Sequence, residues 1–172
     1  LLALLHDVGK SSDKFQAYIH KAKQDPASVK RGSVDHATAG GQILLHAFDE
    51  PYLGQLVSNV LISHHNTLGI KDYLATPENS PFLDRIDKPI DDLPTIKQRF
   101  YTEVMAAPSF QILVDKVAQE LQQYLENVRQ EIEKVYHNEA ECDEELRRVI
   151  FFTQKTLSSI LIDADRTAQH CL

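Results

Sequence analysis

HDVGKSSDKFQAYI, residues 6–19, joins a histidine–aspartate pair to the start of an amphipathic helix. A serine hydroxyl can accept hydrogen bonds from the free backbone N–H groups at a helix start, so Ser11 or Ser12 is a candidate cap. The helix predicted after this cap runs from Asp13 to about Lys23. Its apolar face carries Phe15, Tyr18 and Ile19.

Helical spacing continues outward from this stretch. Glycine is rare, alternating apolar and polar runs are nearly absent, and apolar residues recur three and four positions apart. A first helix is predicted to end at Gly9, and Asp35 is a candidate cap for a later one. The further helices are predicted over residues 36–48, 53–65, 110–135 and 144–168. We therefore predict an all-α helical bundle, a single globular domain over residues 1–172.

One stretch departs from this pattern. Residues 66–99 hold four of the seven prolines, at positions 77, 81, 89 and 94. Proline lacks the backbone N–H and disfavours a helix interior. We predict an irregular insertion here, of the kind that is often functional in compact domains.

Composition excludes several classes of protein. The chain of 172 residues has a formal net charge of −7, so it is not a generic basic nucleic-acid coat. The longest apolar run is too short to cross a bilayer, which predicts no membrane association. Two cysteines, Cys142 and Cys171, form neither a disulfide framework nor a zinc-finger pattern, and they favour a reduced, cytoplasmic location. The opening residues 1–5 read as the end of a longer helix, so we expect the chain to be N-terminally incomplete.

Histidines gather near the predicted helix ends, on or near the apolar faces. They are His6, followed by Asp7, then His36, and the pair His64 and His65. A single inward histidine is usually a hydrogen-bonded core residue. Four inward histidines on three helices, with an aspartate beside one, cannot as easily meet their hydrogen-bonding needs from one another. Imidazole nitrogens and carboxylate oxygens are natural ligands of Zn, Mn, Fe, Co or Ni, so the pattern predicts a metal site.

Such a site needs more negative charge than Asp7 provides, and the last helix offers Asp163 and Asp165. With Leu157 at the centre of the apolar stripe, Asp165 lies about 80° from that centre and Asp163 about 120° away on the other side. Asp165 is thus the better candidate ligand, and Asp163 is more easily read as a solvent-facing or salt-bridging residue.

Lys10 follows Asp7 by three positions. It is either a cation that interacts with a helix C-terminus or a group that binds phosphate and neutralises charge beside the metals. Residues 10–31 are locally basic, with six lysines and arginines against two aspartates. A local basic patch beside a metal centre attracts a phosphodiester backbone.

These residues resemble a known family. The string from His6 to Lys10 is similar to the signature of the HD superfamily of metal-dependent phosphohydrolases, and the longer string with Phe15, Gln16 and Tyr18 resembles the HD nuclease domain of the CRISPR-associated helicase-nuclease of type I systems. The later matching pieces are Asp35-His36 with Gly40, Ser63-His64-His65, and LSSILIDADRTA with Asp165.

The resemblance implies a helical HD-domain bundle that holds two divalent transition-metal ions. It places His6, Asp7 and Asp165 on one ion and Asp7, His36, His64 and His65 on the other, with Asp7 bridging. The implied substrate is single-stranded DNA, cleaved in antiviral defence when a crRNA-guided surveillance complex opens a duplex. The implied partners are that complex and a helicase, fused in the same chain or present as a separate subunit. By the ligand chemistry, Asp7 and Lys10 are the candidate catalytic residues.

The family carries a further histidine ligand upstream of the His-Asp pair, and this sequence starts five residues before His6. We therefore expect the ion at His6 and Asp165 to be weak or absent in this chain, and the other ion to be better supported. Two alternatives stay open. One is an HD phosphohydrolase of nucleotides or cyclic nucleotides, and the other is a degenerate HD domain that binds a partner without catalysis.

Overall fold

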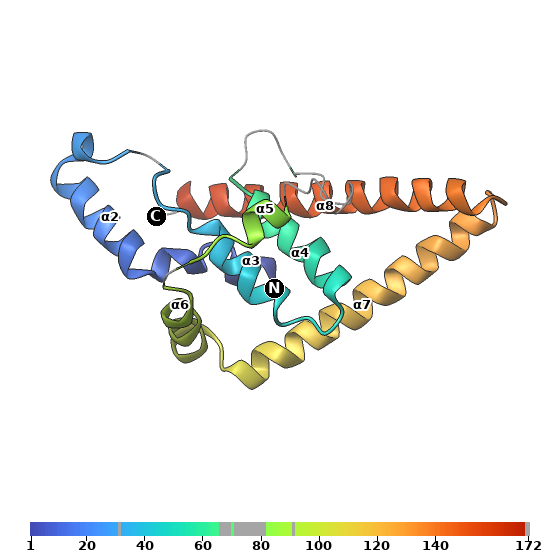
Figure 1. Ribbon diagram of the computed structural model, residues 1–172, viewed down its shortest axis with the longest axis horizontal. Coiled ribbons are helices and arrows are strands. Elements are labelled where there is room, and N and C mark those ends of the chain that lie inside the picture. Colours follow the sequence, from blue (N-terminus) through green and yellow to red (C-terminus); the bar gives the residue numbers. More distant parts are fainter. Residues whose placement is uncertain (31, 66–69, 71–81, 91, 171–172) are drawn as a thin grey trace.

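The computed structural model describes residues 1–30, 32–65, 70, 82–90 and 92–170 (Figure 1). Every regular element in these ranges is helical, which confirms the all-α prediction. In chain order the elements are α1 (Leu2–Leu5), η1 (Val8–Ser11), α2 (Asp13–Gln24), η2 (Pro26–Ser28), α3 (Ala37–Leu45), α4 (Pro51–Ser63), α5 (Leu83–Ile86), α6 (Leu93–Arg99), the π-helical turn η4 (Phe100–Val104), α7 (Ala107–Glu133) and α8 (Glu139–His170).

Helices α3 and α4 form the centre of the molecule. Nearly every residue of both helices is buried, as expected of helices that are covered on all sides. Polar groups inside this pair are satisfied by backbone partners: the Ser58 hydroxyl donates to the Gly41 carbonyl (3.0 Å), and the Gln154 amide of α8 donates to the Leu56 carbonyl (2.8 Å). These hydrogen bonds join α3 to α4 and α4 to α8.

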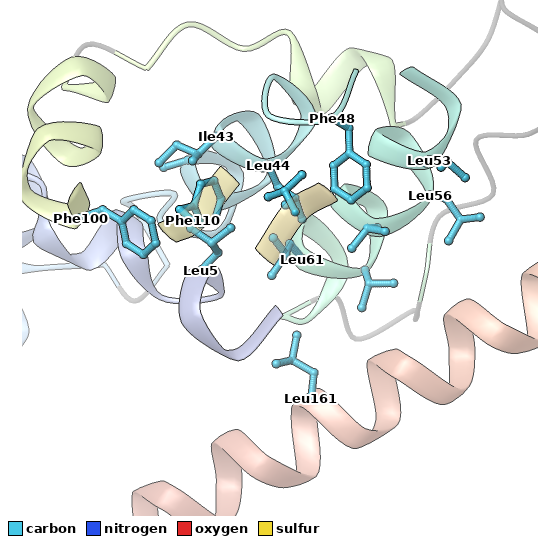
Figure 2. Close-up of a cluster of buried hydrophobic side chains, with 14 of the residues drawn as sticks. Leu5, Ile43, Leu44, Phe48, Leu53, Leu56, Leu61, Phe100, Phe110 and Leu161 are labelled. Carbon is cyan, nitrogen blue, oxygen red and sulfur yellow. The ribbon is translucent and has the colours of Figure 1, made fainter. Parts of the chain in front are cut away.

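A cluster of apolar side chains joins α1, α6 and α7 to this pair (Figure 2). Leu5 of α1 is fully buried beside Leu44 and Leu61. The rings of Phe100 and Phe110 meet edge to face, with centroids 5.3 Å apart, and extend the cluster toward α7. The short helix α1 is therefore held by tertiary packing, because four residues cannot form a stable helix alone.

The prediction of an irregular insertion over residues 66–99 is wrong for its second half. Helices α5 and α6 lie there, while residues 66–69, 71–81 and 91 lie outside the described residues. Pro94 does not break α6 because it stands in the first turn, where its missing N–H is not needed. Tertiary contacts hold the segment: Ile96 is buried, and the Arg99 guanidinium donates to the Ser11 carbonyl and to the Asp13 carboxylate.

The first helix also ends earlier than predicted. Helix α1 stops at Leu5, and Gly9 lies inside the tight turn η1. The reason is packing at two glycines. A Cβ atom on Gly9 would overlap the backbone of His36, and one on Gly40 would overlap the Leu5 carbonyl. These close contacts bring the turn after α1 directly against the start of α3.

Helices α7 and α8 meet at residues 134–138 and diverge from there, with α4 between them (Figure 1). Helix α8 begins earlier than predicted, at Glu139, where the Asn138 side chain accepts a hydrogen bond from the Ala140 N–H (2.9 Å). Ile160, one turn from Leu157 on α8, is 61% exposed. Because the two helices diverge, this position lies beside an open groove instead of a packed neighbour.

Candidate metal centre

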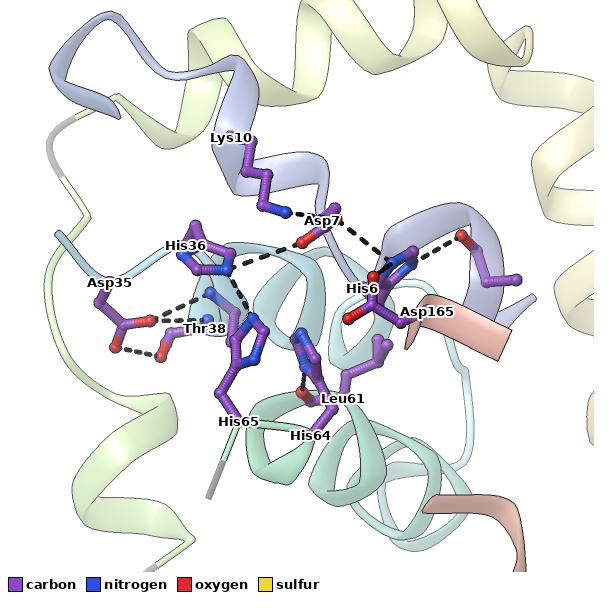
Figure 3. Close-up of polar contacts among 12 residues, drawn as sticks. His6, Asp7, Lys10, Asp35, His36, Thr38, Leu61, His64, His65 and Asp165 are labelled. Atoms are coloured by element: carbon purple, nitrogen blue, oxygen red, sulfur yellow. Dashed lines mark hydrogen bonds and ion pairs between the residues drawn. The ribbon is translucent and has the colours of Figure 1, made fainter. Parts of the chain in front are cut away.

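Six side chains predicted from the sequence come together at one place (Figure 3). They come from the turn after α1, the starting end of α3, the final end of α4 and the C-terminal part of α8. They form two groups whose potential ligand atoms lie within 4.8 Å of one another. The first group is Asp7, His36, His64 and His65, and the second is His6, Asp7 and Asp165. Asp7 belongs to both.

The start of α3 is fixed by Asp35. Its Oδ1 accepts from the backbone N–H groups of Ala37 and Thr38 (both 3.1 Å), and its Oδ2 accepts from the Thr38 hydroxyl (2.7 Å). This confirms Asp35 as a cap of this helix start. His36 stands at the N-cap position, so the capping contacts and the close approach of Gly9 hold its backbone in place.

Backbone carbonyls orient two of the imidazole rings. His64 Nδ1 lies 2.5 Å from the Leu61 carbonyl, and His6 Nδ1 lies 2.9 Å from the Ala3 carbonyl. A carbonyl only accepts, so Nδ1 carries the proton in each ring. When a ring is neutral, its Nε2 keeps its lone pair and faces the centre, which is the arrangement that orients histidine ligands in metal proteins. Nε2 of His6 carries a second proton when it donates to Asp7.

The first group contains buried atoms that need a partner. Asp7 Oδ1 and His64 Nε2 are both buried and have no hydrogen-bond partner within the described part of the chain. An unpaired buried polar atom is costly, and native structures rarely leave one unexplained. His36 Nε2 lies 2.7 Å from His65 Nε2 and 3.6 Å from Asp7 Oδ1. Three nitrogens and a carboxylate oxygen converging in this way suit a divalent transition metal.

The second group is built around His6. Its Nε2 lies 3.3 Å from Asp7 Oδ2 and 3.5 Å from Asp165 Oδ1. Asp163, the other acidic residue considered on this helix, is exposed. The two oxygens of Asp7 therefore face different groups: Oδ1 faces His36, and Oδ2 faces His6.

Lys10 lies beside the second oxygen of Asp7. Its Nζ is 2.6 Å from Asp7 Oδ2, and both side chains are partly exposed. Burial by itself raises the pKa of Asp7. The hydrogen bonds from His6 and Lys10, together with their charges, outweigh burial and hold the pKa of this carboxyl well below its usual range. Asp7 is thus ionised at neutral pH and can attract a cation.

The histidines of the two groups differ in basicity. Burial lowers the pKa of His64 to about 4, and burial also lowers the pKa of His36 and of His65. The hydrogen bond to Asp7 is the main cause that raises the pKa of His6. The three histidines of the first group are therefore neutral at pH 7, and each neutral ring has one unprotonated nitrogen that can bind a cation.

Sequence reasoning missed two cations near this centre, Arg85 and Lys88. They line a cleft of about 860 Å³ that also borders His36 and His65. Both lie in residues 66–99, the stretch that was predicted to be irregular because of its prolines. Their only sequence signal was their charge, and it gave no indication that the segment returns to the site.

A family model described as "Cas3, HD domain" matches residues 1–99, more than half of the chain. The chain belongs to this family. Membership in the Cas3 HD domain family implies a hydrolase, a metal-dependent nuclease of type I CRISPR systems. Comparison with curated proteins and with solved structures found no match. None of the helices in the described residues has the length and apolar character needed to cross a membrane.

The match covers five of the six candidate ligands. Asp165 lies outside residues 1–99, so its assignment rests on the sequence pattern at the end of α8 and on its position beside His6. The structure thus brings Asp165, from beyond the matched region, beside His6 of that region.

Proposed function

We propose that this Cas3 HD domain hydrolyses phosphodiester bonds of single-stranded DNA in type I CRISPR interference, with two divalent transition-metal ions. The observation that carries the proposal is the pair of potential ligand groups that share Asp7. Mn, Fe, Co, Ni and Zn all suit this mixture of imidazole and carboxylate.

The residues present fit such ions. Asp7, His36, His64 and His65 would hold one, and His6, Asp7 and Asp165 would hold the other, with Asp7 contributing one oxygen to each. When bound, the ions supply positive charge for the scissile phosphate and lower the pKa of a water that serves as nucleophile.

The protein's own groups prepare this chemistry. The Ala3 and Leu61 carbonyls hold the His6 and His64 rings with Nε2 toward the centre. Lys10 neutralises part of the charge of Asp7 and stands at the edge of the cleft, where it can attract a phosphate. We propose Asp7 and Lys10 as the residues closest to the reacting phosphate.

The partners follow from the family. We propose that a helicase, in the same chain or as a separate subunit, and a crRNA-guided surveillance complex deliver the displaced strand to this site. The local excess of lysine over residues 10–31 supports a nucleic-acid substrate in a chain of net charge −7.

The test is a substrate panel given to the full chain loaded with Mn²⁺. We expect cleavage of single-stranded DNA and little turnover of nucleotides or cyclic nucleotides. His64→Ala should abolish cleavage, while His137→Ala, which changes an exposed histidine, should not. Turnover of a nucleotide without DNA cleavage would favour the phosphohydrolase alternative. Wild-type protein that binds no metal would favour the degenerate domain.

A further inference from the structure

A cleft runs from the metal centre between α2 and residues 82–90. Its volume is about 860 Å³, and Lys10, His36 and His65 border the end that faces the metal centre. Phe15 and Tyr18 line it from α2, and Arg85 and Lys88 line it from the segment around α5. The two sides are therefore chemically different: one is aromatic and the other cationic.

The aromatic side continues outward from a candidate ligand. The Phe15 ring lies edge-on to the His36 ring, with centroids 5.1 Å apart, and the Tyr18 ring lies 5.8 Å beyond Phe15. Core packing does not explain these rings. Helix α2 has no buried residue, and neither ring belongs to the hydrophobic clusters found among the described residues. They form a half-exposed aromatic surface beside the metal centre.

The cationic side is held in place by the core. The Gln42 side chain of α3 donates to the carbonyls of Ile86 (2.5 Å) and Lys88 (2.7 Å), and Ile86 is itself buried. Arg85 lies 3.6 Å from Asp35, whereas Lys88 is exposed and forms no ion pair with the part of the chain that the structure describes. Among the described residues, three cations and one carboxylate thus line the cleft of an acidic chain.

We propose that this cleft is a nucleotide subsite of the nuclease: an unpaired base next to the cleaved phosphate stacks on Phe15 and Tyr18, and its backbone phosphate contacts Arg85 and Lys88. This inference rests on the proposed function and deepens it. Stacking on aromatic side chains accepts any base, but it needs a base whose face is free. The subsite therefore gives a physical reason for preference for a single strand over a duplex.

The test compares binding of two oligomers to the full chain as purified. One is fluorescent phosphorothioate dT10, which resists hydrolysis, and the other has the same linkages but abasic sugars. Stacking of one base corresponds to about tenfold in affinity. By fluorescence anisotropy we expect wild type to bind dT10 about tenfold more tightly than the abasic oligomer.

Variants then locate the preference. Tyr18→Ala should reduce it to about twofold or less, and Tyr18→Phe should keep it, because the ring remains. Phe152→Ala removes a 66% exposed aromatic residue of α8, outside the cleft, and should also keep it. Lys88→Ala should weaken both oligomers equally, because a phosphate contact does not depend on the base.

Equal binding of the two oligomers by wild type would overturn the proposal, and so would a preference that survives in Tyr18→Ala. The wild-type comparison needs no variant, so it stands even if Tyr18→Ala folds poorly. Binding is measured without hydrolysis. A chain that shows the preference but cleaves no DNA would refute the proposed function alone, and a chain that cleaves without the preference would refute the subsite alone.

Discussion

The two ligand groups share Asp7 but differ in what surrounds them. In the first, three histidines have lowered pKa values, and the buried atoms Asp7 Oδ1 and His64 Nε2 have no hydrogen-bond partner among the described residues. In the second, a single histidine with a raised pKa lies between two carboxylates. At neutral pH each neutral ring of the first group has an unprotonated nitrogen for a cation, whereas in the second the raised pKa of His6 favours a proton that competes with a cation.

Two groups made of the same residue types can therefore differ in their affinity for metal. We expect the first group to bind the tighter ion. The physical cause is burial, which lowers the pKa values of His36, His64 and His65, so that a cation does not have to displace a proton from these rings.

The largest effect is expected at Asp7, because both groups depend on it. Asp7→Ala removes a ligand from each group, so we expect loss of bound metal and a drop of at least about a thousandfold in cleavage of single-stranded DNA. Elemental analysis and cleavage rates measure this effect. Asp163→Ala, an exposed aspartate outside both groups, is the control. A full metal content in Asp7→Ala would contradict a shared ligand.

A paired comparison separates the groups. His64→Ala should weaken the tighter ion by at least about 100-fold, since loss of even an indirect supporting residue costs 10–100-fold. Asp165→Asn should leave that ion in place and affect only the weaker one. Metal titration followed by calorimetry distinguishes the two. If Asp165→Asn released the tighter ion, the ranking of the groups would be reversed.

Gly9 tests whether the groups depend on the close contact between the turn after α1 and the start of α3. A methyl group at this position would overlap the backbone of His36, so in Gly9→Ala the turn after α1 or the start of α3 must shift, which changes the distance between Asp7 and His36. We expect a loss of about 2 kcal/mol in the free energy of unfolding, in the range of overpacked cores, together with weaker metal binding. Urea unfolding and metal titration measure both. Unchanged metal affinity would show that the contact does not position His36.

The pH dependence of the metal-free chain should report the opposite shifts of His64 and His6. The fold disfavours protonation of His64, whose pKa is lowered to about 4, so stability falls as the pH drops from about 6.5 toward 4. This group alone accounts for about 2 kcal/mol between pH 7 and pH 5. The raised pKa of His6 acts in the other direction, because it adds stability at acid pH.

Urea unfolding in EDTA at the two pH values measures the net effect. His64→Ala should make the decline shallower, and His6→Ala should make it steeper. The same slope in both variants would mean that neither ring senses its surroundings as the structure implies.

The smallest effect is expected at Lys10. Lys10→Ala removes a cation that partly neutralises Asp7 but leaves every potential ligand in place. We expect about a tenfold lower cleavage rate with little change in metal content, because one preorganised charge is worth a fraction of the metal contribution. Lys21→Ala on α2 is the control. A loss of metal in Lys10→Ala would assign this lysine to the assembly of the site instead.

Part of the fold could be predicted because its signals are local. The Phe15 N–H donates to the Ser12 hydroxyl (3.1 Å), as the serine beside the predicted helix start suggested, and Asp35 caps its helix in the same manner. The second half of the 66–99 stretch could not be predicted in this way. Pro94 reads as a helix breaker until one knows that it stands in a first turn, and the anchors Phe82 and Ile96 become informative only once they are buried.

The helical class, the family and the residue types that could hold a metal followed from local signals, since periodicity, capping and the His-Asp pattern are properties of neighbouring residues. Tertiary packing turns one oxygen of Asp7 to each group and returns Lys88 to the cleft, and it brings Asp165, which helical periodicity already favoured over Asp163, beside His6. These outcomes depend on how separate helices pack, at contacts such as Gly9 against His36 and Gln42 against residues 86–88. Such contacts join residues far apart in the chain, and no local pattern specifies them.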